Sequence, residues 1–282
     1  MIEKKHRYVI IPYIMIFLLP NAGLAQGLQH PPKQNPFKSF AFTVGGDVLH
    51  VMSSPLRFRQ NDGLKLLTFI ATTTLFMTLL DSRINEDFIA RDDFYVKPGI
   101  GLAKIGHGFD RVSPQYALAG LTVPMLAGAL ILKDRKLLET TRLMLESFVI
   151  AGGITYVGKR VFGRARPYTG EGPHDFEPFK FTVKGERRSF PSGHATSAFA
   201  MMTVVAKQYE QWWIRIPAYT AALSVSFQRI ESRNHWGADV LVGSTIGYWV
   251  GNMLVSRYQQ PSRKTAINPY ILKNRIAFMV SF

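Results

Sequence analysis

Six segments of this 282-residue chain are long, apolar and nearly free of charged residues. They span residues 64–80, 116–132, 143–158, 195–206, 214–228 and 238–256. Apolar runs of about 17 residues reach the lower length limit for a helix that crosses a bilayer. Small residues recur in these runs, as they do where helices pack closely. We therefore predict an all-α fold with a transmembrane six-helix core bundle. A buried bundle in a soluble all-α protein stays open, because 195–206 is too short for a span.

The N-terminus has the pattern of a secretory signal. A mostly basic start, Glu3 to Arg7, precedes the apolar run "YVIIPYIMIFLL", and the small residues Gly23 and Ala25 follow. This pattern predicts a signal peptide over 1–25, with an uncleaved membrane anchor as the alternative. The remaining divisions that we predict are a Pro-rich linker with a short amphipathic pre-helix at 26–63, a helical domain at 64–258, and a basic C-terminal tail at 259–282.

The formal net charge of +15 raises the question of a nucleic-acid partner. The basic residues lie in short clusters between the apolar segments, for example at 133–136 and 257–264. The sequence has neither a basic face with interleaved aromatic residues nor a nucleic-acid-binding motif, so we expect no nucleic-acid partner. Basic loops between membrane helices explain the surplus of positive charge better than a nucleic-acid-binding surface does. The chain has no cysteine, which excludes disulfides, thiolate metal ligands and a cysteine nucleophile.

We predict long loops of mixed polarity at 81–115 and 159–191 and a short basic loop at 133–142, and this difference in charge predicts a topology. The short basic loop 133–142 and the basic tail are expected in the cytoplasm, so that loops 159–191 and 229–237 share the opposite side. A cleaved signal followed by six crossings would instead place those two loops in the cytoplasm. An additional insertion by residues 40–56, or a bundle that is soluble in the periplasm, would remove the conflict.

The stretch "GKRVFGRARPYTG" places Lys159 and Arg166 seven residues apart at the end of the third apolar segment. Seven residues are close to two helical turns, so both side chains can project from one face. Pro167 disfavours helix at Arg166, which presents the guanidinium at a helix end. The alternative is a solvated basic cluster at a membrane edge, in which Arg160 and Arg164 also take part.

The stretch "SFPSGHATSAFA" precedes an apolar helix. Pro191 suits the first turn, and Ser192 and Gly193 offer backbone N–H groups at a helix N-terminus, where anions bind. His194 could give a proton to a departing oxygen there. A histidine at a helix start that only caps or packs is the alternative.

The stretch "QRIESRNHWGADVLVG" places His235 and Asp239 four residues apart on one helical face. A carboxylate in that position can fix the imidazole tautomer and leave the other ring nitrogen free to attack. Arg229 adds a third cation. Two histidines and an aspartate could also bind a metal, but the surrounding cations would repel it, so we predict anion binding and no metal or other cofactor.

Together these motifs resemble the three signature motifs of the type 2 phosphatidic acid phosphatase superfamily. They are Lys-x6-Arg-Pro (Lys159, Arg166, Pro167), Pro-Ser-Gly-His (191–194) and Arg-x5-His-x3-Asp (Arg229, His235, Asp239). Their order and spacing agree with the family, and the resemblance covers roughly residues 64–256. One departure is Gln228, which stands where the family often has serine.

The resemblance implies a metal-independent phosphatase that hydrolyses a phosphomonoester or diphosphate, in particular of a lipid, through a phosphohistidine. By carry-over, His235 is the nucleophile, Asp239 orients it, and His194 is the general acid and then the base. The phosphate-binding residues implied are Lys159, Arg166, Ser192, Gly193 and Arg229. Phosphoryl transfer depends mainly on positioning and charge stabilisation, which such a set supplies.

Two other functions stay open at this point, a vanadate-dependent haloperoxidase and a non-catalytic phospholipid-binding membrane protein. The partners expected are a phosphorylated lipid or small phosphate ester and the membrane bilayer, while the oligomeric state is unknown. We expect a bacterial-type inner-membrane protein with a periplasm-facing active site, or a soluble periplasmic protein.

Overall fold

The computed structural model describes residues 36–57, 60–91, 94, 96–110, 113–179, 184–259, 266–272 and 275–281. The predicted signal segment lies outside this range. Residues up to Ser54 form one unit, which holds helix α1 (Pro36–Met52), and residues from Pro55 form the second unit. Helix α1 lies within the predicted linker and pre-helix segment.

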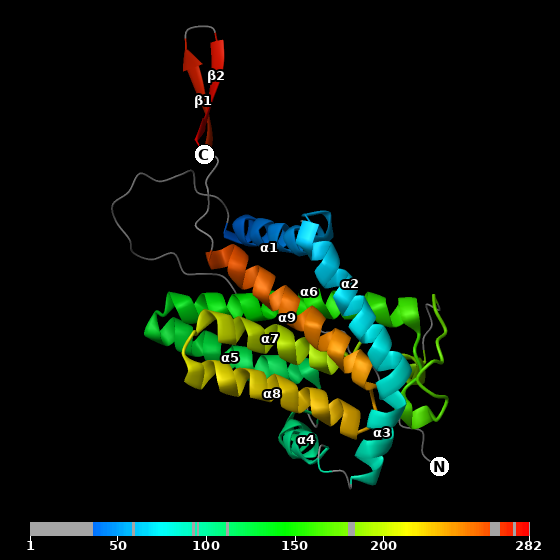
Figure 1. Ribbon diagram of the computed structural model, residues 1–282. Coiled ribbons are helices and arrows are strands. Elements are labelled where there is room, and N and C mark those ends of the chain that lie inside the picture. Colours follow the sequence, from blue (N-terminus) through cyan, green and yellow to red (C-terminus); the bar gives the residue numbers. More distant parts are fainter. Residues whose placement is uncertain are drawn as a thin grey trace. The chain divides into compact units, whose positions relative to one another are not determined.

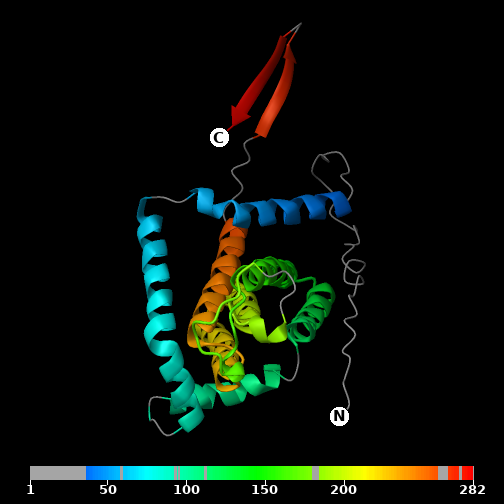
Figure 2. The ribbon, with the colours of Figure 1, turned by 90° about the vertical axis from the view of Figure 1, so that its right-hand side faces the viewer.

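The second unit is mainly helical (Figures 1 and 2). Its longer elements are α2 (Gln60–Leu75), the π-helical η3 (Phe76–Leu80), α3 (Asp81–Ala90), α4 (Lys97–Asp110), α5 (Pro114–Leu132), α6 (Arg135–Phe162), α7 (Gly193–Gln208), α8 (Trp212–Glu231) and α9 (Gly237–Gln259). Short 3₁₀ turns lie at Ser54–Arg57, Pro167–Thr169 and Gly185–Arg187. All six predicted apolar segments fall within these helices.

Two expectations about the rest of the chain are corrected. Residues 81–115 were expected to form a long loop, but α3 and α4 occupy most of that stretch. The C-terminal tail was expected within an all-α fold, yet it contains an antiparallel hairpin of β1 (Ala266–Leu272) and β2 (Arg275–Ser281). Both regions lack the long uniform apolar runs from which the helices were predicted.

Helix α7 is the centre of the bundle and packs against α6, α8 and α9. Its contact with α9 is unusually close, because Gly243, Gly247 and Gly251 of α9 face the α7 backbone. A Cβ added at Gly247 would lie 2.2 Å from the carbonyl oxygen of Thr196, and one at Gly243 would lie 2.5 Å from that of Ser192. These glycines therefore fix the distance between α7 and α9, as small residues do in membrane helix pairs.

The ends of α6 are set by local chemistry. The Asp134 side chain accepts a hydrogen bond from the backbone N–H of Leu137 at 3.1 Å, which caps the first turn. The helix stops at Gly163, whose φ of 57° is left-handed. A Cβ at this glycine would lie 2.0 Å from the Glu177 carbonyl oxygen, so only glycine allows the chain to leave α6 here.

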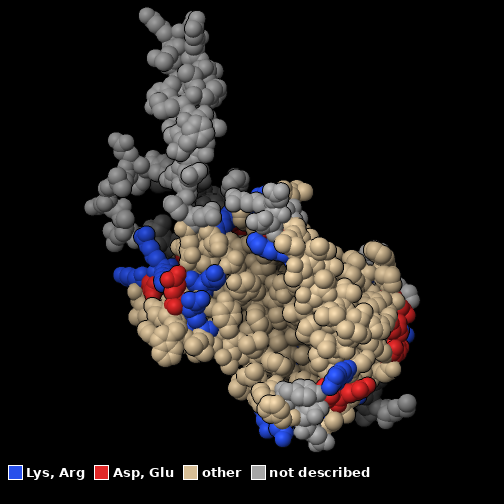
Figure 3. All heavy atoms as spheres, in the orientation of Figure 1, with Lys and Arg blue, Asp and Glu red and all other residues tan. Residues whose placement is uncertain are grey.

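Large apolar side chains cover much of the outer surface of the helices. Leu64, Leu67, Ile131 and Val149 are among those that stay exposed. By length and composition, two helices of the described residues could cross a membrane, Asp62–Ala90 and Pro114–Leu132. On the face drawn in Figure 3, the charged residues gather near the ends of the helices and leave a wide uncharged area between them.

We predict that Gly247→Ala lowers stability by about 1–3 kcal/mol, because the added methyl group pushes α7 and α9 apart. Gly153→Ala in α6 is the matched control, since Gly153 is exposed and an added Cβ meets nothing within 4 Å. Helix propensity favours alanine there by roughly 0.5–1 kcal/mol. Thermal unfolding of the purified proteins measures both changes, and equal unfolding temperatures for the two variants would contradict the tight α7–α9 contact.

Candidate active site

The predicted nucleophile lies in the turn between α8 and α9. The backbone N–H groups of Asn234 and His235 both donate to the carbonyl oxygen of Arg229, at 3.2 Å each. These two bonds fold the turn back onto the end of α8 and fix where His235 points. His235 is only 2% exposed, so its ring is held in a protein environment and not in bulk water.

Asp239 organises the surroundings of His235. One carboxylate oxygen accepts the backbone N–H of Trp236 at 2.9 Å and the hydroxyl of Ser189. The other accepts Arg164 Nη1 at 2.7 Å. The first oxygen lies 3.8 Å from His235 Nδ1, which is a close charge contact but longer than a hydrogen bond. Asp239 therefore faces Nδ1 and leaves Nε2 for a substrate.

The pKa of His235 lies well below its ordinary value. Burial is the main cause, and the charges of Lys159 and Arg166 lower it further, against the opposing effect of Asp239. The imidazole is therefore neutral near pH 7, which is the form that can attack phosphorus.

Ser192 and Gly193 begin α7 beside this turn. The backbone N–H of Ser192 donates to the backbone carbonyl of Asp239 at 3.0 Å, which joins the second and third motifs directly. The Ser192 hydroxyl is buried and has no hydrogen-bond partner among the described residues. A Cβ on Gly193 would lie 3.7 Å from Lys159 Cε, so the first motif is adjacent as well. An unsatisfied hydroxyl at a helix N-terminus is suited to an anion.

Lys159 is half-buried in a group of cations. Its Nζ donates to the Arg188 carbonyl oxygen at 2.5 Å. Its pKa is lowered from 10.5 to about 7, mainly by burial and in addition by the charges of Arg166, Arg229 and Arg188, while Asp239 opposes them. The three predicted phosphate-binding cations are thus close enough to repel one another, and Arg188 is a fourth that the sequence did not single out.

The two predicted arginines are held by neighbours in the α8–α9 connection. Arg166 Nη1 donates to Asn234 Oδ1 at 2.9 Å, while its Nε is buried without a hydrogen-bond partner among the described residues. Arg229 is 4% exposed, and its Nη1 donates to the side-chain oxygen of Gln228 at 3.3 Å. Gln228, which stands where the family often has serine, therefore still supplies a hydrogen-bond acceptor to Arg229. His194 is half-buried in the first turn of α7.

The prediction that loops 159–191 and 229–237 meet is confirmed. The backbone N–H of Tyr168 donates to the Arg233 carbonyl oxygen at 3.2 Å, and Arg233 Nη2 donates to the Pro167 carbonyl oxygen at 2.8 Å. Figure 2 looks onto the end of the bundle where this first loop lies. The alternative of a solvated basic cluster is wrong for Arg164, which is completely buried.

Sequence reasoning missed Asp81, at the start of α3. Its Oδ2 accepts Arg164 Nη2 at 2.6 Å, and its Oδ1 accepts the backbone N–H of Ala238 at 2.9 Å. The only available signal was an acidic residue at the end of an apolar run. Within the described residues, no group of three or more His, Asp or Glu side chains could hold a metal ion.

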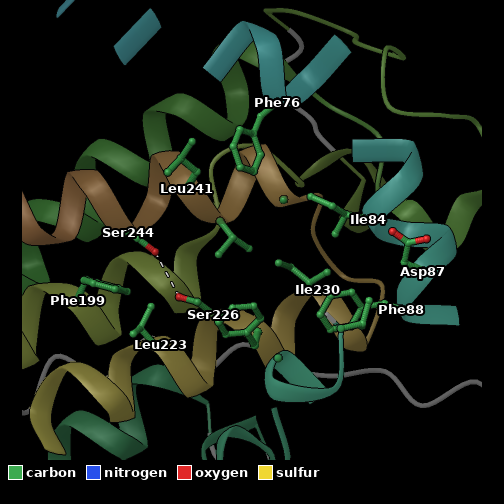
Figure 4. A pocket seen from close by; sticks show the side chains of 15 residues that line it. Phe76, Ile84, Asp87, Phe88, Phe199, Leu223, Ser226, Ile230, Leu241 and Ser244 are labelled. Carbon is green, nitrogen blue, oxygen red and sulfur yellow. Dashed lines mark hydrogen bonds between the residues drawn. The ribbon is translucent and has the colours of Figure 1, made fainter. Parts of the chain in front are cut away.

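A separate apolar cavity of about 480 Å³ lies between α3, α4, α7, α8 and α9 (Figure 4). Phe76, Phe88, Ile230 and Leu241 are among its walls, and Ser226 and Ser244 contact each other at 3.2 Å along one side. None of the predicted catalytic or phosphate-binding residues lines it. The cavity is therefore distinct from the cation cluster.

Residues 141–263 match the family model of the PAP2 superfamily, which confirms the resemblance predicted from the three motifs. The lipid A 1-phosphatase of Porphyromonas gingivalis is 33% identical over 106 residues, which are 37% of this chain and 20% of that protein. The undecaprenyl-diphosphatase of Sulfolobus acidocaldarius is 30% identical over 145 residues, 50% of this chain and 65% of that protein. The chain thus spans less than two thirds of these relatives.

Two solved structures are also similar. One is LpxE of Aquifex aeolicus, with 24% identity, a TM-score of 0.42, and coverage of 63% of this chain and 93% of that one. The other is a transmembrane PAP2-type phosphatidylglycerolphosphate phosphatase from Bacillus subtilis, with 16% identity, a TM-score of 0.44, and coverage of 70% and 98%.

We predict that anion affinity depends on the charge of Lys159. In the free protein this lysine is mostly protonated below its pKa of about 7 and mostly neutral above it. Affinity for tungstate, an oxyanion whose own charge is constant near neutral pH, should therefore fall as pH rises from 6 to 8. The variant Lys159→Arg keeps its charge throughout, so the fall should be smaller. Titration calorimetry measures both, and identical pH profiles would contradict the depressed pKa.

Proposed function

Because residues 141–263 match the family model of the PAP2 superfamily, we propose that this protein hydrolyses a phosphate ester or diphosphate without a metal, through a phosphohistidine on His235. One observation carries the proposal. Three buried or half-buried cations (Lys159, Arg166 and Arg229) converge beside a neutral, buried histidine and an unsatisfied serine hydroxyl. Cations that repel one another in a protein interior are stabilised by an anion that binds among them.

The two steps balance with residues of this chain alone. In the first, His235 Nε2 forms a bond to phosphorus, the bond from phosphorus to the leaving oxygen breaks, and His194 gives that oxygen a proton. In the second, His194 takes a proton from water, the water oxygen bonds to phosphorus, and the N–P bond breaks. Asp239 stabilises the positive charge that the imidazole acquires, while the cations and the α7 N-terminus stabilise the charge on the non-bridging oxygens.

A lipid is the substrate class that we favour. The relatives are named for lipid A and undecaprenyl diphosphate, both of which are lipids with phosphate groups. The cradle lies at helix ends, whereas the exposed apolar side chains lie along the helices. A lipid could place its phosphate in the cradle and its hydrocarbon beside the bundle, with the head group at the membrane interface.

Release of phosphate from an aryl phosphate and from a lipid phosphate tests the function. The purified protein should release phosphate from both in excess EDTA, and vanadate should inhibit it because it mimics the trigonal-bipyramidal transition state. His235→Ala should lower turnover by at least about 10³-fold, as loss of a nucleophile does elsewhere. It should also abolish the acid-labile phosphoenzyme.

His194→Ala provides the internal comparison. Loss of the general acid should slow hydrolysis of alkyl phosphates more than that of aryl phosphates, because a good leaving group needs little protonation. Equal losses of hydrolysis rate on alkyl and aryl phosphates would contradict the role of His194 as general acid. Activity that disappears on chelation and returns with Mg²⁺ would overturn the metal-free mechanism, and bromide oxidation with peroxide and vanadate would favour the haloperoxidase.

We further propose an inner-membrane location with the cradle facing the periplasm. In this cysteine-free chain, a single cysteine at Glu171 reports on the cradle end of the bundle, and one at Arg135 reports on the basic end. Both positions are exposed. A membrane-impermeant maleimide should label Glu171→Cys in intact spheroplasts and label Arg135→Cys only after lysis. The opposite order would place the site in the cytoplasm, and labelling of both would favour a soluble periplasmic protein.

A further inference from the structure

Arg164 lies between two buried carboxylates and touches no predicted phosphate-binding atom. Its Nη1 donates to Asp239 Oδ1 at 2.7 Å and its Nη2 to Asp81 Oδ2 at 2.6 Å. Its Nε and Nη2 also donate to the Pro173 carbonyl oxygen, at 2.8 and 2.6 Å. All three charged side chains are 0% exposed. With its donors used in this way and no contact with solvent, Arg164 is not part of the anion cradle.

Asp81 connects this arginine to the helix that carries Asp239. Its second oxygen accepts the backbone N–H of Ala238, in the first turn of α9. A carboxylate from α3 thus caps α9 from outside, where the helix dipole favours negative charge. Asp81 therefore binds the backbone of the residue just before Asp239, and it is connected to the Asp239 side chain through Arg164.

The arrangement restricts Asp239 to one orientation. Arg164 occupies one carboxylate oxygen, while Trp236 N–H and the Ser189 hydroxyl occupy the other, which is the oxygen that faces His235 Nδ1. If Arg164 were lost, the carboxylate could rotate, and the imidazole would lose its fixed partner.

We propose that Arg164 and Asp81 are positioning residues for the nucleophile, acting on His235 through Asp239. The proposal rests on the phosphatase function proposed above. It implies that changes in this pair reduce the rate of attack by His235 and leave the anion cradle intact. A role in folding alone would instead affect stability and anion binding together.

Asp81→Asn is the first test, because asparagine keeps an oxygen for the Ala238 N–H, removes the charge, and places an NH2 group where Oδ2 accepts from Arg164. We expect kcat on an aryl phosphate to fall on the order of 10²-fold, the size of effect that a misplaced reacting group produces. KM and the inhibition constant of vanadate should stay near the wild-type values. Arg164→Lys should behave in the same way, because a single ammonium group cannot replace a guanidinium group whose two terminal nitrogens each bind a carboxylate.

Arg187→Gln is the matched control. Arg187 lies in the same loop and pairs with Glu171, Asp175 and Glu177, but these ion pairs are partly exposed. Its loss should leave kcat unchanged. All variants are compared by thermal unfolding, kcat, KM and vanadate inhibition.

The outcomes separate the two proposals. Wild-type protein that releases no phosphate from any phosphate ester overturns the proposed function and this inference with it. Active wild type together with an unchanged kcat in Asp81→Asn overturns the positioning role alone. An Asp81→Asn protein that fails to fold, or that loses vanadate affinity as steeply as kcat, also overturns it, since the pair would then act on the structure as a whole.

Discussion

Asp239 is the residue on which the site depends, because four residues from three segments of the chain bond to it. Its backbone carbonyl accepts the Ser192 N–H, and its carboxylate accepts bonds from Ser189, Trp236 and Arg164. Transfer of an ionised carboxylate from water into a protein interior costs on the order of several kcal/mol, unless ion pairs and hydrogen bonds satisfy its oxygens. The fold supplies those bonds only when the loop after α6, the start of α7 and the start of α9 are all in place. The three motifs therefore cannot be arranged independently, and the same contacts that stabilise the charge also assemble the site.

Helix packing sets the precision of this assembly. The glycines of α9 bring its backbone against α7 at Ser192 and Thr196, so the N-termini of the two helices lie side by side. The start of α7 contacts the first turn of α9 through the Ser192 N–H and the Asp239 carbonyl oxygen, and the positive dipole end of α7 favours an anion there. Sites carried on helix ends that are locked by backbone contacts hold their geometry better than sites on loops. The loop after α6 contributes cations, but Gly163 fixes where it leaves the helix.

The sequence predicted the parts of the site whose spacing is local. The Lys159–Arg166 and His235–Asp239 intervals are short, and the apolar runs located the helices that bring them together. The shared helical faces that were expected do not form, because α6 ends at Phe162, before Arg166, and α9 begins at Gly237, after His235. The contacts that were missed are long-range. Arg164 and Asp81 are 83 residues apart in the chain, and no periodic pattern links them. Their charges looked like solvated surface because burial depends on the tertiary packing of α3, which itself was not predicted. The hairpin of β1 and β2 was not predicted for a similar reason, since each strand depends on pairing with the other and not on a run of apolar residues.

The charge balance of the site agrees with the metal-free reaction proposed above. A divalent ion would bring concentrated positive charge but would need carboxylate ligands, and the carboxylate nearest to the nucleophile, Asp239, is already bonded to Arg164. Positive charge comes instead from Lys159, Arg166 and Arg229. Burial is the main cause that lowers the pKa of the lysine to about 7, and the charges of the two arginines contribute to the shift. An arriving phosphate reverses that balance, since its negative charge favours the protonated lysine and relieves the repulsion among the arginines. The lysine would thus acquire its full charge when the substrate is bound, at the moment when the imidazole must attack a phosphorus atom surrounded by anionic oxygens.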